Sequence, residues 1–134
     1  MALKELAERE CFQLLASRVV GRVAVVVDGE ARVFPVNYLV DGDDIVFRTG
    51  EGTKLDAARS GALVTFEVDA SDPLYHTGWS VMVTGPLEAV TEPGELHRLH
   101  GLPVRAWGGD GRHIVRMPIA RVAGRRIERA ANGT

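Results

Sequence analysis

The sequence predicts a mainly β protein with short α-helices, arranged as a closed or partly closed antiparallel barrel. Runs rich in β-branched residues recur at a spacing of about ten residues, separated by glycine-containing turns. Only short stretches have helical periodicity, which argues against a parallel α/β sheet. The 134 residues, 46% hydrophobic and 25% charged, suit a single soluble domain spanning 1–134.

A first helix is expected at about residues 6–17, because apolar residues recur there at helical spacing between charged ones: Leu6, Cys11, Leu14 and Leu15. Cys11, the single cysteine, is expected to be a buried small apolar residue in a reducing compartment. The N-terminal sequence has no apolar run, so we expect no signal peptide. The longest apolar runs are too short to span a membrane. A cytoplasmic location follows.

A hairpin follows the first helix. The β-branched run 19–27 ends at Asp28-Gly29, which suits the positive φ angles of a tight turn, so residues 31–40 form the returning strand. Pro35 removes a backbone donor from that strand and is therefore expected at an edge, a bulge or an opening, where a ligand can bind. A third strand at 45–49 completes an antiparallel meander.

The remaining chain alternates short helices and strands. We expect the last residues, AANGT, to be frayed. The other expected elements are a helix with Thr53 as its N-cap and Gly61 as its stop, a strand at 62–68, a polar loop at 69–77, a strand at 79–90 bent at Gly85-Pro86, a helix at 91–100, a glycine-rich loop at 101–112, and strands at 113–117 and 121–127.

The connection FRTGEGTKL, residues 47–55, carries groups that suit a phosphate. Arg48 is able to make a planar bidentate contact and Lys54 a point-charge contact, and the start of the following helix adds favourable potential. The hydroxyls and the close backbone approach come from Thr49, Thr53, Gly50 and Gly52. The residues alone leave open a plain strand-to-helix turn with solvated charges.

Other chemistry is poorly supported by the sequence. The connection is not a phosphate-binding Walker A motif, because its glycines are too close together and its threonine precedes its lysine. His97 and His100 are interpreted as exposed helix residues, and His76 and His113 as loop and strand-end residues, so no metal site is expected. A net charge of −2 argues against nucleic acid or an anionic membrane as a partner. A cofactor would have to supply any chemistry.

Three segments in this order resemble a known family: VFPVNYLVDGDDIVFRTGEGTKL, GWSVMVTGPLEAV and RHIVRMPIARVAGRRI. They are similar to the pyridoxamine 5′-phosphate oxidase-like, FMN-binding split β-barrel proteins, especially the short bacterial members of unassigned substrate. The similarity covers about residues 8–128. The resemblance implies a six-stranded antiparallel split β-barrel that forms a homodimer with two flavin sites at the interface.

The resemblance also implies which residues bind the cofactor. It places a strand segment beside the isoalloxazine ring, two residues and a helix start at the phosphate, and one polar strand residue near the flavin, with Trp79 next to it. The implied residues are Pro35, Val36 and Asn37; Arg48 and Thr49; Thr53 and Lys54; and Ser80. Trp107 either covers the flavin or substrate from the partner subunit or packs on its own barrel.

The expected function is that of an FMN-binding oxidoreductase with a small-molecule substrate that is not assigned. The chain ends soon after GRRI without the C-terminal arginine and tryptophan residues of the true oxidases, so we do not expect pyridoxamine phosphate oxidase activity itself. Three alternatives remain open: an F420-dependent reductase of the same fold, a non-catalytic module that sequesters or senses flavin, and a barrel that has lost its ligand.

Overall fold

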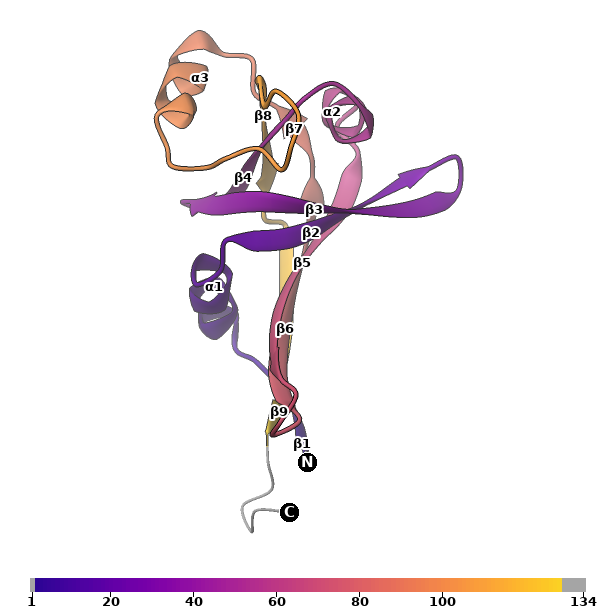
Figure 1. The fold of residues 1–134 in the computed structure, drawn as a ribbon, viewed down its shortest axis with the longest axis vertical. Helices are drawn as coiled ribbons and strands as arrows, with labels where there is room; N and C mark the ends of the chain where they lie inside the picture. Colours follow the sequence, from indigo (N-terminus) through magenta and orange to yellow (C-terminus); the bar gives the residue numbers. More distant parts are fainter. Residues whose placement is uncertain (1, 129–134) are drawn as a thin grey trace.

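The computed structural model describes residues 2–128, and within them the chain forms nine strands and three short helices (Figure 1). The strands form one antiparallel sheet in the order β1-β9-β6-β5-β2-β3-β4-β8-β7. The elements are β1 (Ala2–Glu5), α1 (Glu8–Ala16), β2 (Val20–Val27), β3 (Glu30–Asp41), β4 (Asp44–Thr49), α2 (Thr53–Arg59), β5 (Leu63–Asp72), β6 (Thr77–Pro86), β7 (Glu88–Ala89), α3 (Pro93–His100), β8 (His113–Pro118) and β9 (Arg121–Glu128).

The mainly β class and the split-barrel arrangement are confirmed, but the strand count differs from the expected six. One extra strand, β1, pairs with β9 from Ala2–Glu128 to Glu5–Arg125. Its own sequence contains no β-branched residue, so only this distant pairing makes it a strand. Another is the two-residue strand β7, which the bend after Pro86 separates from β6. The expected frayed C-terminus lies outside the described residues.

The hairpin of β2 and β3 is confirmed. Asp28 and Gly29 have φ angles of 52° and 77°, and the ladder begins at Val27–Glu30 directly beside them. Positive φ at both central residues is what a two-residue turn between twisted strands requires. The sequence order β2, β3, β4 is also the order in the sheet, which confirms the meander.

Strand β3 changes neighbours along its length, and Pro35 lies in the part with one neighbour. Residues 30–37 pair with β2, whereas residues 38–41 pair with β4. Pro35 lies opposite Arg22 of β2 in unbroken register, so there is no bulge, and no other strand pairs with β3 at this point. The edge expected for Pro35 is therefore confirmed, because a residue without N–H is tolerated where one side of a strand has no ladder.

The N-cap of helix α2 lies one residue earlier in the chain than expected. Gly52, with φ 141°, occupies the N-cap position, and no side chain caps this helix, so the prediction that Thr53 is the N-cap was wrong. Gly61, at φ +67°, follows the C-cap and ends the helix as expected. All three helices are short, and within residues 2–128 none is long and apolar enough to cross a membrane.

Strands β5 and β6 extend beyond the barrel as a long arm. The segment 69–77 was expected to be a loop, but residues 69–72 continue β5 and pair with 77–80 of β6, leaving only residues 73–76 as the turn. The lower part of β9 and β1 lie beside this ladder, so the arm is four strands wide (Figure 1). Asp69, Ser71 and Asp72 had indicated a loop, and their pairing with residues 77–80 of β6 makes this segment a strand.

The core lies inside the barrel. Large side chains such as Phe47, Phe66 and Leu15 are almost fully buried there, and the hydroxyl of Tyr38 donates to the carbonyl of Leu15, which attaches α1 to the barrel. Gly21 is required at one crossing, because a Cβ at this position would lie 2.2 Å from the Phe66 ring. Such close packing fixes the strands that carry the site.

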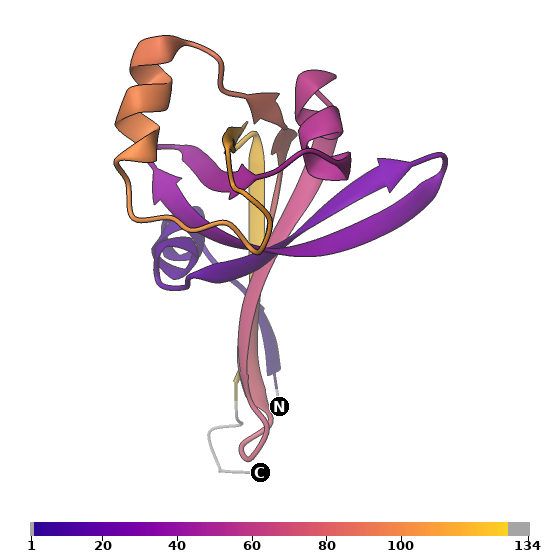
Figure 2. The same ribbon diagram turned by 45° about the horizontal axis from the view of Figure 1, so that its top comes forward.

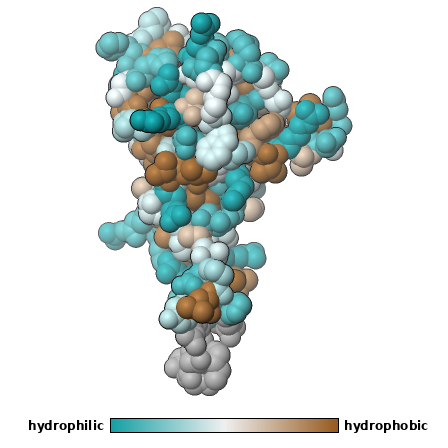
Figure 3. All heavy atoms as spheres, viewed as in Figure 1, coloured by the Kyte–Doolittle hydropathy of each residue, from teal (hydrophilic) through white to brown (hydrophobic). Residues whose placement is uncertain are grey.

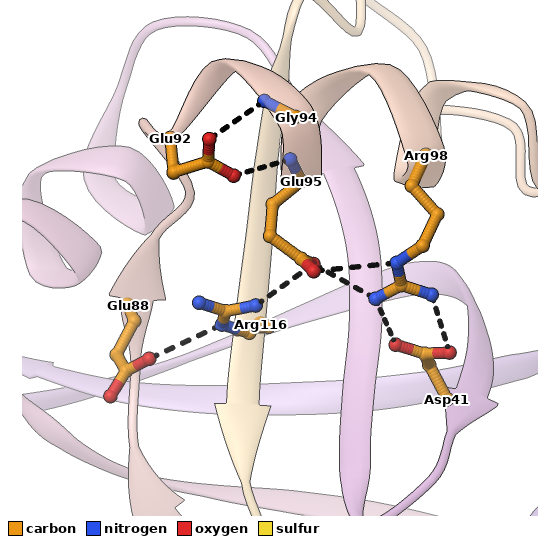
Figure 4. A network of polar contacts seen from close by, with 7 residues as sticks. All are labelled: Asp41, Glu88, Glu92, Gly94, Glu95, Arg98 and Arg116. Atoms are coloured by element: carbon orange, nitrogen blue, oxygen red, sulfur yellow. Dashed lines mark hydrogen bonds and ion pairs between the residues drawn. The ribbon is translucent and has the colours of Figure 1, made fainter.

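Helix α3 is fixed to the sheet by a network of charged groups (Figure 4). Arg98 donates to both carboxylate oxygens of Asp41 at 3.0 and 2.8 Å, and to Glu95 at 2.8 Å. Arg116 of β8 contacts Glu95 and Glu88 at 3.4 Å. The carboxylate of Glu92 accepts from the first free amides of the helix. The network therefore fixes the position from which the chain enters the loop 101–112.

Candidate functional site

The connection between β4 and α2, residues 48–54, lies where the sheet opens, and we call it the basic turn. The β3–β4 ladder ends at Tyr38–Phe47. In the same register Asn37 and Arg48 would be the next pair, but residue 37 and those before it pair only with β2. Asn37 and Arg48 therefore flank the point at which the two strands separate. A split of this kind exposes backbone groups that a ligand is able to contact.

Lys54 connects the basic turn to the free edge of β3. Its ammonium nitrogen lies 4.5 Å from the centre of the Phe34 ring, a cation–π distance. Partial burial lowers the pKa of Lys54, because desolvation penalises the charged form. No acidic side chain of residues 2–128 forms a salt bridge with it. The lysine thus carries a positive charge that an anion would stabilise.

Arg48 has one of its donors occupied. Its Nε donates to the carbonyl oxygen of Gly111 at 2.9 Å, whereas its two terminal nitrogens form no hydrogen bond within the described residues. The side chain is half-buried, and Thr49 next to it is 7% exposed. A guanidinium held at Nε leaves its outer edge oriented for a bidentate contact with two phosphate oxygens.

The acids of this region are paired with other cations. Glu51 accepts from Arg59 at 3.1 Å and lies 3.2 Å from His113, and these contacts lower the pKa of Glu51, the hydrogen bond from Arg59 most. Asp110 lies 3.6 Å from Arg112. Arg48 and Lys54 therefore keep charges that no neighbouring carboxylate neutralises.

Residues 105–112, the second part of the loop 101–112, pack directly on the basic turn, and we call them the glycine-rich loop from here on. A Cβ on buried Gly111 would lie 2.7 Å from Ala106 and 3.7 Å from Nε of Arg48, and a Cβ on Gly50 would lie 3.1 Å from the carboxylate of Asp110. Figure 2 shows this segment crossing in front of β4 between α3 and β8. Trp107 lies in this loop with 54% of its surface exposed. The sequence identified the loop but gave no signal that Arg48 would hold it.

The other expected site residues are distributed unevenly. Pro35 is exposed and Asn37 half-buried at the free edge of β3, but Val36 is 1% exposed and its side chain belongs to the core. Only the backbone of Val36 is therefore free to meet a ligand. Thr53 lines a separate cavity of about 240 Å³ between β2 and α2, together with Asp56 and Ser60.

Ser80 and Trp79 lie on the arm, away from the basic turn. They line a cavity of about 590 Å³, which we call the arm cavity. In the ladders Ser80 is paired with Asp69 and Arg125, and these two residues, which sequence reasoning missed, also line the cavity. No hydrogen bond, ion pair or ring contact within residues 2–128 joins the arm cavity to the basic turn. Within one chain the expected site residues thus lie in two separate places.

The remaining reactive side chains occupy structural positions. His97 and His100 are exposed on α3, His76 lies in the turn of the arm, and His113 begins β8, each as expected. Cys11 is buried at 1% exposure, and burial raises the pKa of its thiol, so a reactive thiolate is disfavoured. Within the described residues no three His, Cys, Asp or Glu side chains are grouped to hold a metal ion.

Comparisons with known proteins agree with this fold. The sequence model of the pyridoxamine 5′-phosphate oxidase family matches residues 7–126. An uncharacterised protein of Mycobacterium tuberculosis is 36% identical over 103 residues, which cover 73% of this chain and 68% of the relative.

Two solved structures are also similar over nearly the whole chain. The FAD-binding protein of Mycobacterium smegmatis is 33% identical with a TM-score of 0.72, covering 95% of this chain and 100% of that one. A FAD-binding protein of Mesorhizobium loti is 25% identical with a TM-score of 0.79, covering 96% of this chain and 100% of that one.

Proposed function

The chain belongs to the pyridoxamine 5′-phosphate oxidase family, and on this premise we propose that it is a flavin-binding oxidoreductase that acts on a small molecule. The observation that carries the proposal is the pair of cations at the basic turn. Arg48 and Lys54 approach the opening between β3 and β4 and have no acidic partner among the described residues. Their charge suits the phosphate that flavin nucleotides carry.

The residues present fit such a phosphate. The glycines at 50 and 52 bring backbone close to the opening, and a Cβ at Gly52 would meet no atom within 4 Å, so this part of the turn is open. Arg48 supplies two free terminal nitrogens, and an anion beside Lys54 would stabilise the charge that partial burial disfavours. The edge of β3 at Pro35 offers backbone acceptors to a flat ring.

The protein's own groups bind and orient rather than react. A bound flavin supplies electron or hydride transfer at its N5 atom. Arg48 and Lys54 fix the phosphate end, and the free edge of β3 supports the ring, so the substrate meets the cofactor in one orientation. No side chain of the basic turn is required as a nucleophile. We do not propose pyridoxamine phosphate oxidation, because a shared fold does not by itself imply a shared activity.

A homodimer explains why the expected site lies in two places. In the proposed dimer the flavin lies between subunits, with Arg48 and Lys54 from one chain and Ser80 with Trp79 from the arm of the other. The arm supports this arrangement, since its cavity is bordered by exposed apolar side chains such as Leu3 and Ile127. We place the dimer in the cytoplasm, where the single free thiol of Cys11 stays reduced.

The identity of the flavin is open at the basic turn. FMN, our first proposal, presents a terminal phosphate, and FAD carries the same ribityl phosphate within a pyrophosphate. The binding of FAD by two similar proteins supports FAD as well. The deazaflavin F420 remains the alternative cofactor with a phosphate at the corresponding position.

An absorbance titration of the purified protein with FMN, FAD and F420 tests this proposal. The expected result is saturable binding of at least one flavin, with Arg48→Ala and Lys54→Ala each weakening FMN binding by about 1–3 kcal/mol, the size of a lost charge-assisted bond. Arg9, an exposed cation on α1, provides the control variant Arg9→Ala, which should bind like the wild type. A colourless protein that binds none of the three cofactors would contradict the proposal. Binding without turnover with any reductant would restrict it to a flavin-sequestering module.

A further inference from the structure

The glycine-rich loop is built onto the proposed phosphate site of its own chain. The carbonyl of Gly111 accepts from Nε of Arg48 at 2.9 Å, and Ala106 lies against Gly111 from the other end of the loop. Asp110 approaches Gly50 of the basic turn. The two ends of the segment 106–111 therefore lie against each other, and contacts with Arg48 and Gly50 fix its position.

This segment presents an aromatic face that has no stacking partner among the described residues. Trp107 follows Ala106 directly, is 54% exposed, and no ring or cation of residues 2–128 stacks on it. Its indole ring is thus open to a planar ligand, and an exposed aromatic face is a stacking platform for a nucleotide base. Because Ala106 lies against Gly111 and Gly111 accepts from Arg48, only Ala106 and Gly111 separate the backbone of Trp107 from the guanidinium.

A second unneutralised cation lies two residues before the tryptophan in the chain. Arg105 is exposed, and no acidic side chain within the described part of the chain forms a salt bridge with it. Arg112 at the other end of the loop is instead paired with Asp110 at 3.6 Å. An aromatic face with an adjacent arginine, next to a phosphate site, is the combination that binds a nucleotide by stacking on its base and pairing with its phosphate.

We propose that the glycine-rich loop binds the adenylate half of a flavin dinucleotide, with Trp107 stacking on the adenine and Arg105 pairing with the second phosphate. This inference rests on the proposed flavin site and adds to it the selection of FAD over FMN. Arg48 couples the two halves, because the same guanidinium contacts the first phosphate and holds the loop through Nε. The loop belongs to the subunit that binds the phosphate, so Trp107 contacts the cofactor bound by Arg48 of its own chain and not the one bound by the partner subunit.

Equilibrium titrations with FMN, FAD and AMP test the inference, since each nucleotide is a separate probe. The wild type is expected to bind FAD at least tenfold more tightly than FMN, the size of effect that one base stacked on an aromatic side chain gives. Trp107→Ala should remove most of this preference by weakening FAD while FMN is unchanged, and Trp107→Phe should retain most of it. Arg105→Ala should weaken FAD by a smaller factor, and Arg9→Ala neither ligand.

The outcomes separate this inference from the proposed function. If the wild type binds no flavin, the proposed function fails and the inference fails with it. If flavins bind but FMN and FAD bind equally, the inference alone is overturned. It is also overturned if Trp107→Ala weakens FMN and FAD by the same factor, which would place the ring over the flavin itself, or if that variant changes only the oligomeric state, which would make Trp107 an interface residue.

Discussion

The basic turn and the arm differ in the contacts that their side chains make within one chain. At the basic turn the acids Glu51 and Asp110 are paired with other cations, and Arg48 is held by a loop of the same chain. Around the arm, apolar side chains such as Leu3 and Leu74 are 62% and 76% exposed, and Figure 3 shows hydrophobic surface near the lower end of the arm. The basic turn leaves two cations without an acidic partner among the described residues, whereas the arm exposes apolar side chains.

The largest expected effect comes from Gly111→Val, which breaks the contact between the loop and the basic turn. The left-handed φ of +59° and the 2.7 Å approach to Ala106 both disfavour a side chain, so we expect a loss of about 2–4 kcal/mol in the free energy of unfolding, and weaker flavin binding. Urea denaturation measures the free energy of unfolding. Gly108→Ala is the matched control, because Gly108 has φ +76° but no atom within 4 Å, and should lose only about 1–2 kcal/mol. Equal losses in the two variants would show that the loop is not packed on Arg48.

The second largest expected effect is on dimerisation through the arm. Ile127, which is 41% exposed beside the arm cavity, should be buried in the proposed dimer. Ile127→Asp is expected to weaken dimerisation by about 2 kcal/mol, a typical hot-spot loss, with a shift toward monomer in sedimentation velocity. Val26→Asp, at a 70% exposed position on the β2–β3 hairpin, should leave the dimer intact. A wild type that stays monomeric, or a dimer that tolerates Ile127→Asp, would remove the arm from the interface.

A smaller effect concerns Lys54 in the basic turn. A double-mutant cycle with Phe34→Leu and Lys54→Met should give a coupling of about 0.5–1 kcal/mol in the unfolding free energy. If Lys54 turns to a phosphate on binding, this coupling falls when FMN is present. A coupling that FMN leaves unchanged would indicate that Lys54 stays on the ring and does not bind the ligand.

The smallest expected effect is on the pH dependence of stability, and it comes from Glu67 of β5. Burial, assisted by Asp69, raises the pKa of Glu67 from 4.5 to about 7. The folded state therefore retains a proton that the unfolded chain releases, and the stability from this group falls as pH rises from about 4.5 to about 7. Glu67→Gln should remove that fall in melting temperatures measured at pH 5 and pH 8. A pH dependence identical to that of the wild type would show that Glu67 titrates normally.

The parts of the fold that the sequence predicted are those determined by local chemistry. Asp28-Gly29 specifies its hairpin, Pro35 its strand edge and Pro93 the first turn of α3, because each acts through its own backbone geometry. Strand β1 was missed because only its pairing with β9 makes it a strand. Thr53 was assigned as a cap because its hydroxyl fits that role, but Gly52 already occupies the N-cap position.

The site was predictable in its charges and not in its assembly. Arg48 and Lys54 were identified from residue type and spacing, and the structure places them at one opening. The contact of Arg48 with Gly111 joins residues 63 positions apart, and no local pattern encodes such a contact. Ser80 was assigned to the same site, yet in one chain it lines the arm cavity. In the proposed dimer the site is divided between two copies of the chain, and such a division leaves no sign in the spacing of either half.

The most direct test of the basic turn as a phosphate site compares FMN with riboflavin, which lacks only the phosphate. The wild type should bind FMN far more tightly than riboflavin, by about 2–6 kcal/mol if Arg48 and Lys54 each form one charge-assisted bond. In the double variant Arg48→Ala, Lys54→Ala the two ligands should bind with nearly equal affinity. A wild type that does not distinguish FMN from riboflavin, or a preference that survives in the double variant, would contradict the assignment.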